Sequence, residues 1–507
     1  MKIPKRRGVA ALIGVFVALL IVACSTSPSE ETDGVSVDPT ATFSPADATA
    51  TWVAFEPERD RIAAEILEQQ SAQQTVVAAT QLAMEPLPTI IRPEPDPTPQ
   101  PPPERAVPTG VVDRIAFSDG SGSVFTVNPD GSDSVTVAEG STLNGEFRYT
   151  FPVWSPDGGT VSFSSFLIVE DTVSQSSLHR ADADGNSVIV TLAIDPTSQS
   201  GVGPGVPHFT TWSPNGDRIA LTTSGEFGIG SMLLGSYSGE NPKGIAIGAP
   251  LYINWAPDGS SILIHQEAGL HLTPVDGATS GLPRAVGTGS VSFNSPSWAP
   301  DSRSFVHVDT IDGNRSVVIT QADDLTTQTV IGDGDTRVGL GWSPTGDQIA
   351  IAYGSGTSFH TVSLYDVEAE IETVLYEGEV RALWWSPDGS KLAIVEDSPD
   401  IDLAHIWSVI DIESTAVTPL VTQVASDEFL FVQVFFDQYV DSHNVWSPDS
   451  TRLVISGAIL DVEEVLSSEG DVNLPEQFDS QIWVLDADGS SVPVSVGSGT
   501  IASWSPR

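Results

Sequence analysis

A short motif recurs along most of the chain, and it constrains the fold more than any other feature of the sequence. It consists of a tryptophan, a serine or alanine, a proline and, in most copies, an acidic or amide residue followed by glycine or serine. The tryptophans of the copies are Trp154, Trp212, Trp255, Trp298, Trp342, Trp385, Trp446 and Trp504. They follow one another at intervals of 58, 43, 43, 44, 43, 61 and 58 residues. A period near 43 residues is typical of folds in which each repeat forms one small sheet buried against its neighbours.

Each copy of the motif predicts a tight hairpin turn. Proline sets φ for the second turn position, an acidic or amide residue suits the third, and glycine accepts positive φ at the fourth. The tryptophan before the turn is expected to end the innermost strand of its sheet and to pack between sheets. Alternating apolar residues follow the turn, as in 217–221 and 391–395, and predict the next strand.

These units resemble the TolB-type propeller repeat, a WD40-like repeat that also occurs in the propellers of the prolyl oligopeptidase and dipeptidyl peptidase families. The resemblance covers the chain from about residue 110 onward and implies an all-β propeller fold, but no particular activity. The peptidases of those families keep their catalytic serine in a separate α/β-hydrolase domain, marked by Gly-x-Ser-x-Gly. That pentapeptide does not occur in this sequence. We therefore expect a protein that is not an enzyme and needs no cofactor.

The two ends of the repeat region complement each other. Residues 113–140 contain three expected strands without a preceding tryptophan motif, whereas residues 500–506 contain one expected strand and its motif. Pairing the C-terminal strand with the N-terminal three would leave neither end with an exposed edge. The sequence thus predicts an all-β, eight-bladed β-propeller closed by this pairing, with seven blades as the alternative.

The N-terminus has the layout of an export signal. Its first residues are basic, at Lys2, Lys5, Arg6 and Arg7, and an apolar run follows that is too short for a comfortable membrane span. The run ends Ile21-Val22-Ala23-Cys24, which resembles the bacterial lipobox and implies cleavage before Cys24 and lipid attachment to its thiol. The alternative is an ordinary signal peptide with a chance cysteine. Acyl chains on Cys24 would hold the protein on the extracytoplasmic side of the cell membrane or the outer membrane of a bacterium.

Composition divides the chain into five parts. Residues 1–23 are the predicted lipoprotein signal peptide, 24–56 a lipidated flexible tether, 57–85 a spacer helix, 86–110 a proline-rich stalk and 111–507 the propeller. Ten prolines between Pro86 and Pro108 favour an extended, stiff conformation for the stalk. A helix that self-associates or binds a partner is the alternative for 57–85.

Charge and cysteine content exclude several classes of function. The chain has 67 acidic and 21 basic side chains, for a net charge of −46, so it lacks the clustered cations that nucleic-acid binding needs. Cys24 is its one cysteine, which excludes disulfide frameworks and cysteine-ligated zinc. Adaptation to salty surroundings is an alternative reason for the acidity.

The longest intervals between motifs locate a candidate binding surface. Their extra residues predict loops at 167–178, 196–210, 397–404, 422–444 and 458–479, on the face opposite the tryptophan turns and in three neighbouring blades. The candidate binding residues are the aromatics Phe429, Phe431, Phe435, Phe436 and Tyr439 and the acids Asp461, Glu463, Glu464, Glu469 and Asp471. An aromatic patch beside an acidic rim fits a protein or a cationic ligand. The alternative is that the aromatics pack inward as a local cap and the acids are merely solvated.

Metal sites have weaker support. Aspartate-rich segments at 182–186, 333–335 and 486–489 look like fragments of calcium loops, but they lack the spaced acids and the final glutamate, so plain turns are expected. The eight histidines are scattered without a His-Glu-x-x-His pair, and no metal is predicted.

The leading hypothesis is a membrane-anchored, non-catalytic module that binds or scaffolds an envelope protein, a peptide or a glycan. The alternative is a hydrolase or lyase whose site lies in the central funnel of the propeller.

Overall fold

The computed structural model describes most of the repeat region. The described residues are 113–142, 146–169, 172–185, 188–194, 207–225, 228–235, 243–247, 251–266, 269–275, 283–287, 294–334, 337–355, 358–462 and 479–506. They belong to one compact unit. The predicted signal peptide, Cys24, the tether, the helix at 57–85 and the stalk lie outside the described residues, so these predictions are not tested.

Almost all described elements are antiparallel strands, which form six hydrogen-bonded sheets within the described part of the chain. The first sheet joins β1 (Ile115–Ser118), β2 (Val124–Val127) and β3 (Val135–Ala138) to β30 (Ile501–Trp504). The second contains β4 (Glu146–Trp154), β5 (Thr160–Val169), β6 (Thr172–Asp182) and β7 (Val188–Ile194). The third contains β8 (Pro207–Trp212), β9 (Arg218–Gly225), β10 (Gly228–Gly235) and β11 (Lys243–Ile247).

The remaining strands continue the same pattern. The fourth sheet contains β12 (Leu251–Trp255), β13 (Ser261–Gln266), β14 (Gly269–Pro274) and β15 (Arg284–Val286). The fifth contains β16 (Ser297–Trp298), β17 (Ser304–Ile311), β18 (Asn314–Gln321) and β19 (Gln328–Asp333). The sixth contains β20 (Arg337–Trp342), β21 (Gln348–Ser355), β22 (Ser358–Asp366), β23 (Ile371–Trp385), β24 (Lys391–Asp397), β25 (His405–Asp411), β26 (Val417–Ala425), β27 (Arg452–Leu460), β28 (Gln481–Asp486) and β29 (Val494–Ser498).

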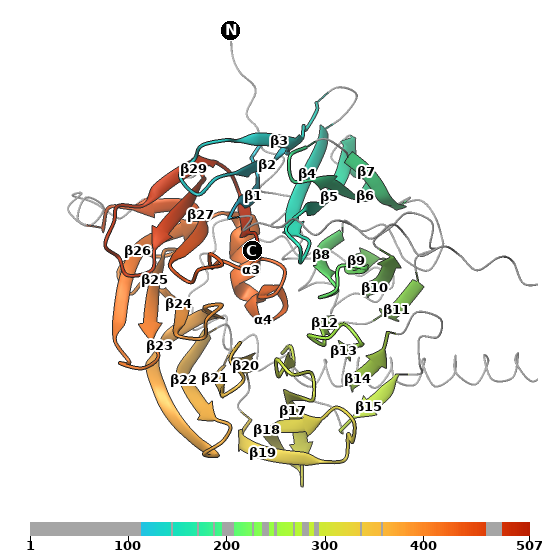
Figure 1. Cartoon of the computed structure of the whole chain (residues 1–507). Helices are drawn as coiled ribbons and strands as arrows, with labels where there is room; N and C mark the ends of the chain where they lie inside the picture. Colours follow the sequence, from blue (N-terminus) through green and yellow to red (C-terminus); the bar gives the residue numbers. More distant parts are fainter. Residues whose placement is uncertain are drawn as a thin grey trace, which may run out of the picture. The chain divides into compact units, whose positions relative to one another are not determined.

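The sixth sheet has ten strands because two of its strands serve neighbouring repeats. The first part of β23 pairs with β22, and its end pairs with β24, with Trp385 opposite Leu392. Likewise the end of β26 pairs with β27, with Ala425 opposite Gly457. An isolated bridge between Trp446 and Leu453 stands where the next inner strand would end. Figure 1 shows the sheets following one another in chain order around a central region.

The two ends of the repeat region meet in the first sheet. Strand β1 pairs on one side with β2 and on the other with β30, with Ile115 opposite Trp504. Asp113 links this sheet to β27, because one carboxylate oxygen accepts from the Trp504 indole N–H (2.7 Å) and the other from the Arg452 guanidinium (2.7 Å). The apolar side chains of the first sheet pack against both β27–β28 and β4–β5.

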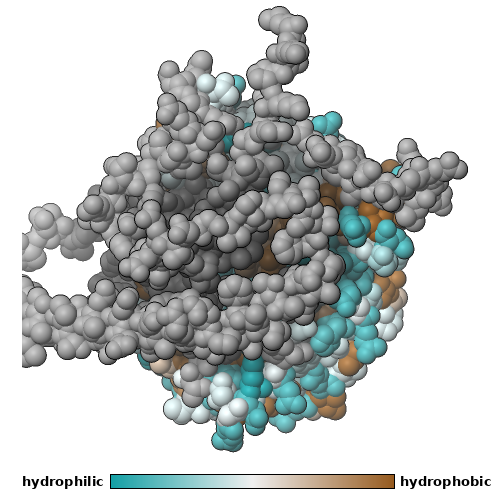
Figure 2. Space-filling model, turned by 180° about the vertical axis from the view of Figure 1, so that it is seen from behind, coloured by the Kyte–Doolittle hydropathy of each residue, from teal (hydrophilic) through white to brown (hydrophobic). Residues whose placement is uncertain are grey.

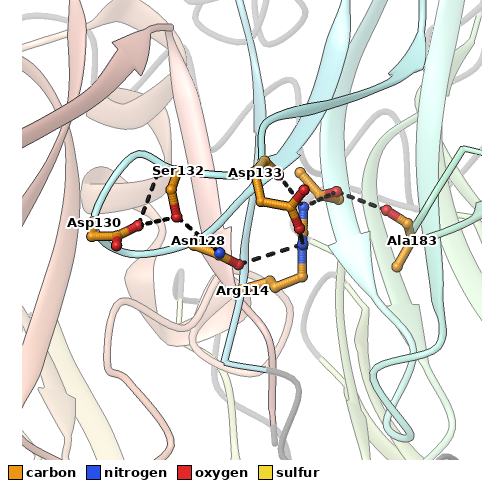
Figure 3. A network of polar contacts seen from close by, with 7 residues as sticks. Arg114, Asn128, Asp130, Ser132, Asp133 and Ala183 are labelled. Carbon is orange, nitrogen blue, oxygen red and sulfur yellow. Dashed lines mark hydrogen bonds and ion pairs between the residues drawn. The ribbon is translucent and has the colours of Figure 1, made fainter.

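A polar network also ties the first sheet to the second (Figure 3). The Arg114 guanidinium donates to the Asp133 carboxylate (2.8 Å) and to the Thr126 hydroxyl (3.2 Å). The Thr126 hydroxyl in turn donates to the carbonyl of Ala183, beyond β6 (2.7 Å). The first sheet is therefore connected to both of its neighbours by polar as well as apolar contacts.

The predicted hairpin turns are confirmed, and the structure gives their serine a role. The Gly158 N–H donates to the Ser155 carbonyl (2.8 Å), and Gly158 has a φ of 69°. The Ser155 hydroxyl accepts from the Thr160 N–H (3.0 Å) and donates to the Asp157 carboxylate (2.6 Å). One serine thus satisfies a backbone donor at the start of the next strand and orients the acidic residue of the turn.

Five of the eight motif tryptophans, Trp212 and Trp298 among them, donate an indole hydrogen bond to the repeat before their own. The Trp385 indole donates to the carbonyl of Gly341 in β20 (2.9 Å), and the Trp446 indole donates to the carbonyl of Trp384 (3.0 Å). In the same way the Trp154 indole donates to the carbonyl of Ser503 in β30 (3.2 Å). At these five positions the tryptophan contributes both buried area and a hydrogen bond between repeats, whereas the indoles of Trp342 and Trp504 bond within their own repeat.

Two of the expected loops are regular structure instead. The expectation of a loop at 167–178 is wrong, because β5 and β6 form one long hairpin that pairs up to Val169 opposite Thr172. The strands extend because Val, Ile and Thr are frequent in this part of the hairpin, and such residues favour strands. Segment 422–444 is also no loop: after the end of β26 it forms α3 (Asp427–Val434) and α4 (Phe436–Tyr439).

Candidate functional site at the centre of the sheets

Residues 426–443, which connect β26 to the bridge at Trp446, lie at the centre of the sheets (Figure 1), and we call them the central insertion. The Ser426 hydroxyl accepts from the Phe429 N–H (3.3 Å) and so caps the N-terminus of α3. Two acidic residues, Asp427 and Glu428, follow in the first turn, where the helix dipole favours negative charge. The insertion therefore has a local signal for a helix start, which the analysis of the sequence did not use.

Three of the five predicted aromatic residues fill the interior of the protein. The side chains of Phe429, Phe436 and Tyr439 are 1%, 2% and 1% exposed. Their rings lie 5.9 Å from Trp407, 5.8 Å from Phe359 and 5.2 Å from Phe209, measured between ring centroids. The expectation that these three side chains form an exposed patch is wrong, and inward packing describes them.

The other two aromatics, Phe431 and Phe435, are partly buried, with their ring centroids 4.9 Å apart. Phe431 also lies edge-on to Tyr439, at 5.7 Å. This pair retains some surface, so a role in ligand binding stays a prediction for Phe431 and Phe435.

The central insertion carries a polar side toward the fourth, fifth and sixth sheets. Asp437 accepts from the Ser295 backbone N–H (2.7 Å), and burial raises the pKa of Asp437 to about 6. The Asn254 side chain donates to the Asp441 carboxylate (3.2 Å), whose residue is exposed. Asp437 and Asp441 are four residues apart, the spacing that places two side chains on one side of a helical segment.

Arg337, the first residue of β20, holds the same region from the opposite side. Its guanidinium donates to the carbonyl of Val434 at the end of α3 (3.1 Å) and lies 4.7 Å from the centroid of the Phe359 ring. The positive charge of Arg337 partly offsets the effect of burial on the pKa of Asp437. Arginine at this place stabilises the carboxylate and the C-terminal end of the helix together.

Two further polar side chains of the insertion are fully buried. Burial lowers the pKa of His443 to about 3, so its imidazole is neutral at physiological pH. Its Nδ1 lies 3.0 Å from the Ser442 hydroxyl. Gln433 is 0% exposed, and neither its amide nitrogen nor its amide oxygen has a hydrogen-bond partner among the described residues.

Of the five acidic residues predicted to form a rim, Asp461 alone belongs to the described residues. Asp461 is exposed directly after β27, whereas Glu463, Glu464, Glu469 and Asp471 lie outside the described residues. The sequence analysis also missed Asn254, Ser295 and Arg337, because each lies in a different repeat from the insertion. Nothing in the local pattern around these three residues distinguishes them from other strand-end residues.

Two of the three aspartate-rich segments form turns, whereas Asp333 ends β19 and residue 335 lies outside the described residues. The Gly185 N–H donates to the Asp182 carbonyl (2.9 Å) and the Gly489 N–H to the Asp486 carbonyl (3.0 Å), which is the hydrogen bond of a β-turn. Among the described residues no group of three or more His, Cys, Asp or Glu side chains is placed to hold a metal ion. None of the described helices has the length and apolar character that a membrane crossing needs.

Sheets of four antiparallel strands repeated around a centre define the architecture. The chain folds as a β-propeller. No protein-family model matches the propeller's sequence, and no curated protein matches it. Among solved structures, the dihydro-heme d1 dehydrogenase NirN in complex with DHE is similar with a TM-score of 0.50 and 13% identity, over 78% of this chain and 76% of that chain.

Two further solved structures are similar to this propeller at lower scores. TolB from Acinetobacter baumannii has a TM-score of 0.34 and 15% identity, over 70% of this chain and 86% of that chain. An oligogalacturonate lyase in complex with manganese has a TM-score of 0.41 and 12% identity, over 68% of this chain and 84% of that chain. At such identities the likeness concerns the fold alone.

Proposed function

We propose that this protein is a non-catalytic propeller that binds a protein, peptide or glycan on its loop-rich face, on the extracytoplasmic side of a bacterial membrane. The observation that carries this proposal is the central insertion, which occupies the middle of the sheets with buried aromatic side chains. Its charged groups have partners in the surrounding sheets, such as Ser295 for Asp437 and Asn254 for Asp441. Such a filled centre favours recognition at the surface over chemistry in a funnel.

In this proposal the ring has eight blades. The pairing of β30 with β1 supports the count, because it completes a four-stranded sheet from the two ends of the repeat region. The indole of Trp154 supports it further, since it contacts β30 as Trp385 contacts β20. With seven blades, one of the four-stranded units along the chain would have no position in the ring.

The proposed location rests on the N-terminal sequence. Cys24 at the end of an export signal would carry the lipid anchor, and 24–110 would separate the propeller from the membrane. Replacing Cys24 with serine is expected to move the protein from the detergent phase to the aqueous phase of a phase-partition experiment. An unchanged distribution would contradict lipid attachment.

The proposed binding face is the one that carries the central insertion and the β27–β28 connection. Both lie opposite the tryptophan turns, because connections alternate between the two faces of an antiparallel sheet. The partly buried Phe431 and Phe435 and the exposed Asp441 and Asp461 are its described candidates. The acids at 463, 464, 469 and 471 would extend its negative charge.

Charge neutralisation tests this face better than deletion, because removing the insertion would remove core residues. The test variant changes Glu463, Glu464, Glu469 and Asp471 to their amides. The matched control neutralises four exposed acids in turns of the opposite face, Asp184, Glu368, Glu413 and Asp488. Cross-linked partners captured from native envelope extract should be lost with the test variant and kept with the control; equal capture by both would contradict the proposed face.

One observation favours the alternative of a hydrolase or lyase. Asp437, buried and with its pKa raised to about 6, has the kind of environment in which a carboxyl group exchanges protons near neutral pH. If Asp437 is structural, as the Ser295 hydrogen bond supports, D437N will leave partner capture unchanged.

A further inference from the structure

A shallow, open cavity of about 480 Å³ lies between the fifth and sixth sheets. Its walls come from the end of β19, the β21–β22 hairpin and the first part of β23, and none of its lining residues belongs to the central insertion. The residues that matter for its chemistry are Asp333, Tyr353, His360, Thr361, Glu372 and Val374.

Two of these groups, the Tyr353 hydroxyl and the Glu372 carboxylate, converge above Gly332. A Cβ atom on Gly332 would lie 2.5 Å from the Tyr353 hydroxyl and 3.5 Å from a carboxylate oxygen of Glu372. Burial raises the pKa of Tyr353, and the negative charges of Glu372 and then Asp333 raise it further. The phenol therefore stays protonated beside two carboxylates, and the absence of a side chain at Gly332 leaves room for the Tyr353 hydroxyl.

The charge of the cavity is one-sided. Two carboxylates, a phenol, an imidazole and hydroxyl groups line it, and no lysine or arginine is among its lining residues. Arg315 approaches from outside, where its Cγ would lie 2.6 Å from a Cβ on Gly334, but it does not line the cavity. Such a set of acceptors attracts an organic cation rather than an anion.

One exposed apolar side chain, Val374, lines the cavity together with the carboxylates. Val374 and Ile371 in β23 are 56% and 58% exposed, and Val330 in β19 is 51% exposed. Figure 2, seen from the side opposite to Figure 1, shows hydrophobic residues scattered among hydrophilic ones on the described surface. An apolar wall beside a cation-binding pocket suits a charged head on an aliphatic stem.

We propose that this cavity binds the guanidinium group of an arginine side chain presented by an extended peptide segment of a partner protein. The planar guanidinium would bridge Asp333 and Glu372, and the arginine stem would lie along Val374. Arginine fits better than lysine because its fork reaches two separated carboxylates and its plane can stack on the Tyr353 or His360 ring. This proposal rests on the proposed function in one respect: it assumes that the ligand is a segment of a protein or peptide.

The probe is the peptide acetyl-Val-Arg-Val-amide, titrated into the full mature protein at low salt. The comparison peptide has citrulline, which keeps the shape of arginine and lacks the charge. We expect binding of the arginine peptide that weakens as salt is added, and at least tenfold weaker binding of the citrulline peptide. Equal binding of the two peptides, or no binding of either, would overturn the proposal.

Variants locate the binding. E372Q and D333N should each weaken binding of the arginine peptide about tenfold, whereas E413Q, a matched change at an exposed turn, should not. G332A, whose methyl group would displace the Tyr353 hydroxyl toward the cavity, should weaken binding with both carboxylates retained. An unchanged thermal midpoint in each variant shows that the fold is kept.

The two proposals can fail separately. If neutralising the acids at 463–471 abolishes partner capture while E372Q leaves peptide binding unchanged, the cavity proposal is wrong and the proposed function stands. If E372Q abolishes peptide binding but neither set of variants changes partner capture, the cavity proposal stands and the proposed function is wrong.

Discussion

The tryptophan turns and the central insertion represent two ways in which this chain holds itself together. In the turn at Ser386, the hydroxyl contacts Asp388 and Lys391, two and five residues away. In the insertion, Asp441 contacts Asn254 across 187 residues and Asp437 contacts Ser295 across 142. The turns are local and repeated, whereas the insertion depends on residues from distant repeats. Equivalent substitutions in different turns should therefore change the free energy of unfolding by similar amounts. Substitutions in the insertion should have effects that depend on their particular partners.

The largest expected effect is acid unfolding, which involves the insertion and the strands around it. Burial lowers the pKa of His179, His307 and His405 to about 4 and that of His443 to about 3. Because the unfolded pKa is near 6.5, their contribution to stability is complete above pH 6.5 and is lost as pH falls toward 4. Each histidine contributes about 1.4 kcal/mol per pH unit in that window. Denaturant titrations from pH 7.5 to 4.5 should therefore show a steep fall in the free energy of unfolding.

The histidines also test the comparison itself. H443Q removes the buried histidine of the insertion, and H179Q removes one from the second sheet. In each variant the free energy of unfolding should fall less steeply with pH, by about 1.4 kcal/mol per pH unit, because one titrating histidine is removed. A pH profile that neither variant changes would mean that other groups cause the acid sensitivity.

The next effect concerns the core of the insertion. F436A removes a ring that is 2% exposed and packs on Phe359 and Trp384, so it should cost about 3–5 kcal/mol of unfolding free energy. F431A, in the same insertion but partly buried, should cost less. Equal losses in urea titrations would contradict the distinction between these two rings.

Asp437 should act in the direction opposite to the histidines. Its pKa of about 6 lies above the 3.8 of an ordinary aspartate, so the fold favours the protonated form, and stability falls as pH rises from about 4 to 6. D437N keeps an oxygen for the Ser295 N–H and carries no charge, so it should be more stable than the parent at pH 7.5, by about 1–3 kcal/mol. The two proteins should differ little at pH 4; a destabilised variant at pH 7.5 would contradict this account.

The smallest expected effect is in the turns. S386A leaves the Lys391 N–H without its hydroxyl acceptor, and S447A does the same to the Arg452 N–H. Each should cost about 1–2 kcal/mol, because the bond to the backbone N–H and the bond to the carboxylate of Asp388 or Asp449 are both lost. The two losses should agree within about 0.5 kcal/mol, since the turns are equivalent. Clearly different losses in thermal or urea unfolding would show that the repeats are not interchangeable.

The candidate site was less predictable than the turns for a physical reason. The aromatic content of 422–444 indicated that the segment buries apolar surface, but burial against a ligand and burial against the sheets have the same composition. Phe429, Phe436 and Tyr439 proved to face the sheets, because rings such as Trp407, Phe359 and Phe209 offer them a surface there. The length of the β5–β6 hairpin could not be predicted from the sequence either. A long interval between motifs is compatible with a long loop and with two longer paired strands.

The sequence by itself determined the repeating part of this protein: the hairpin turns, the strands around them and the tryptophan before each turn. These features depend on φ preferences, on alternation and on contacts within a few residues, all of which a sequence displays directly. The tertiary structure alone decided what fills the centre, which acids are buried and where the fifth and sixth sheets leave a cavity. Those outcomes depend on residues such as Asn254, Ser295 and Arg337, which come together with the insertion once the sheets have been arranged around it.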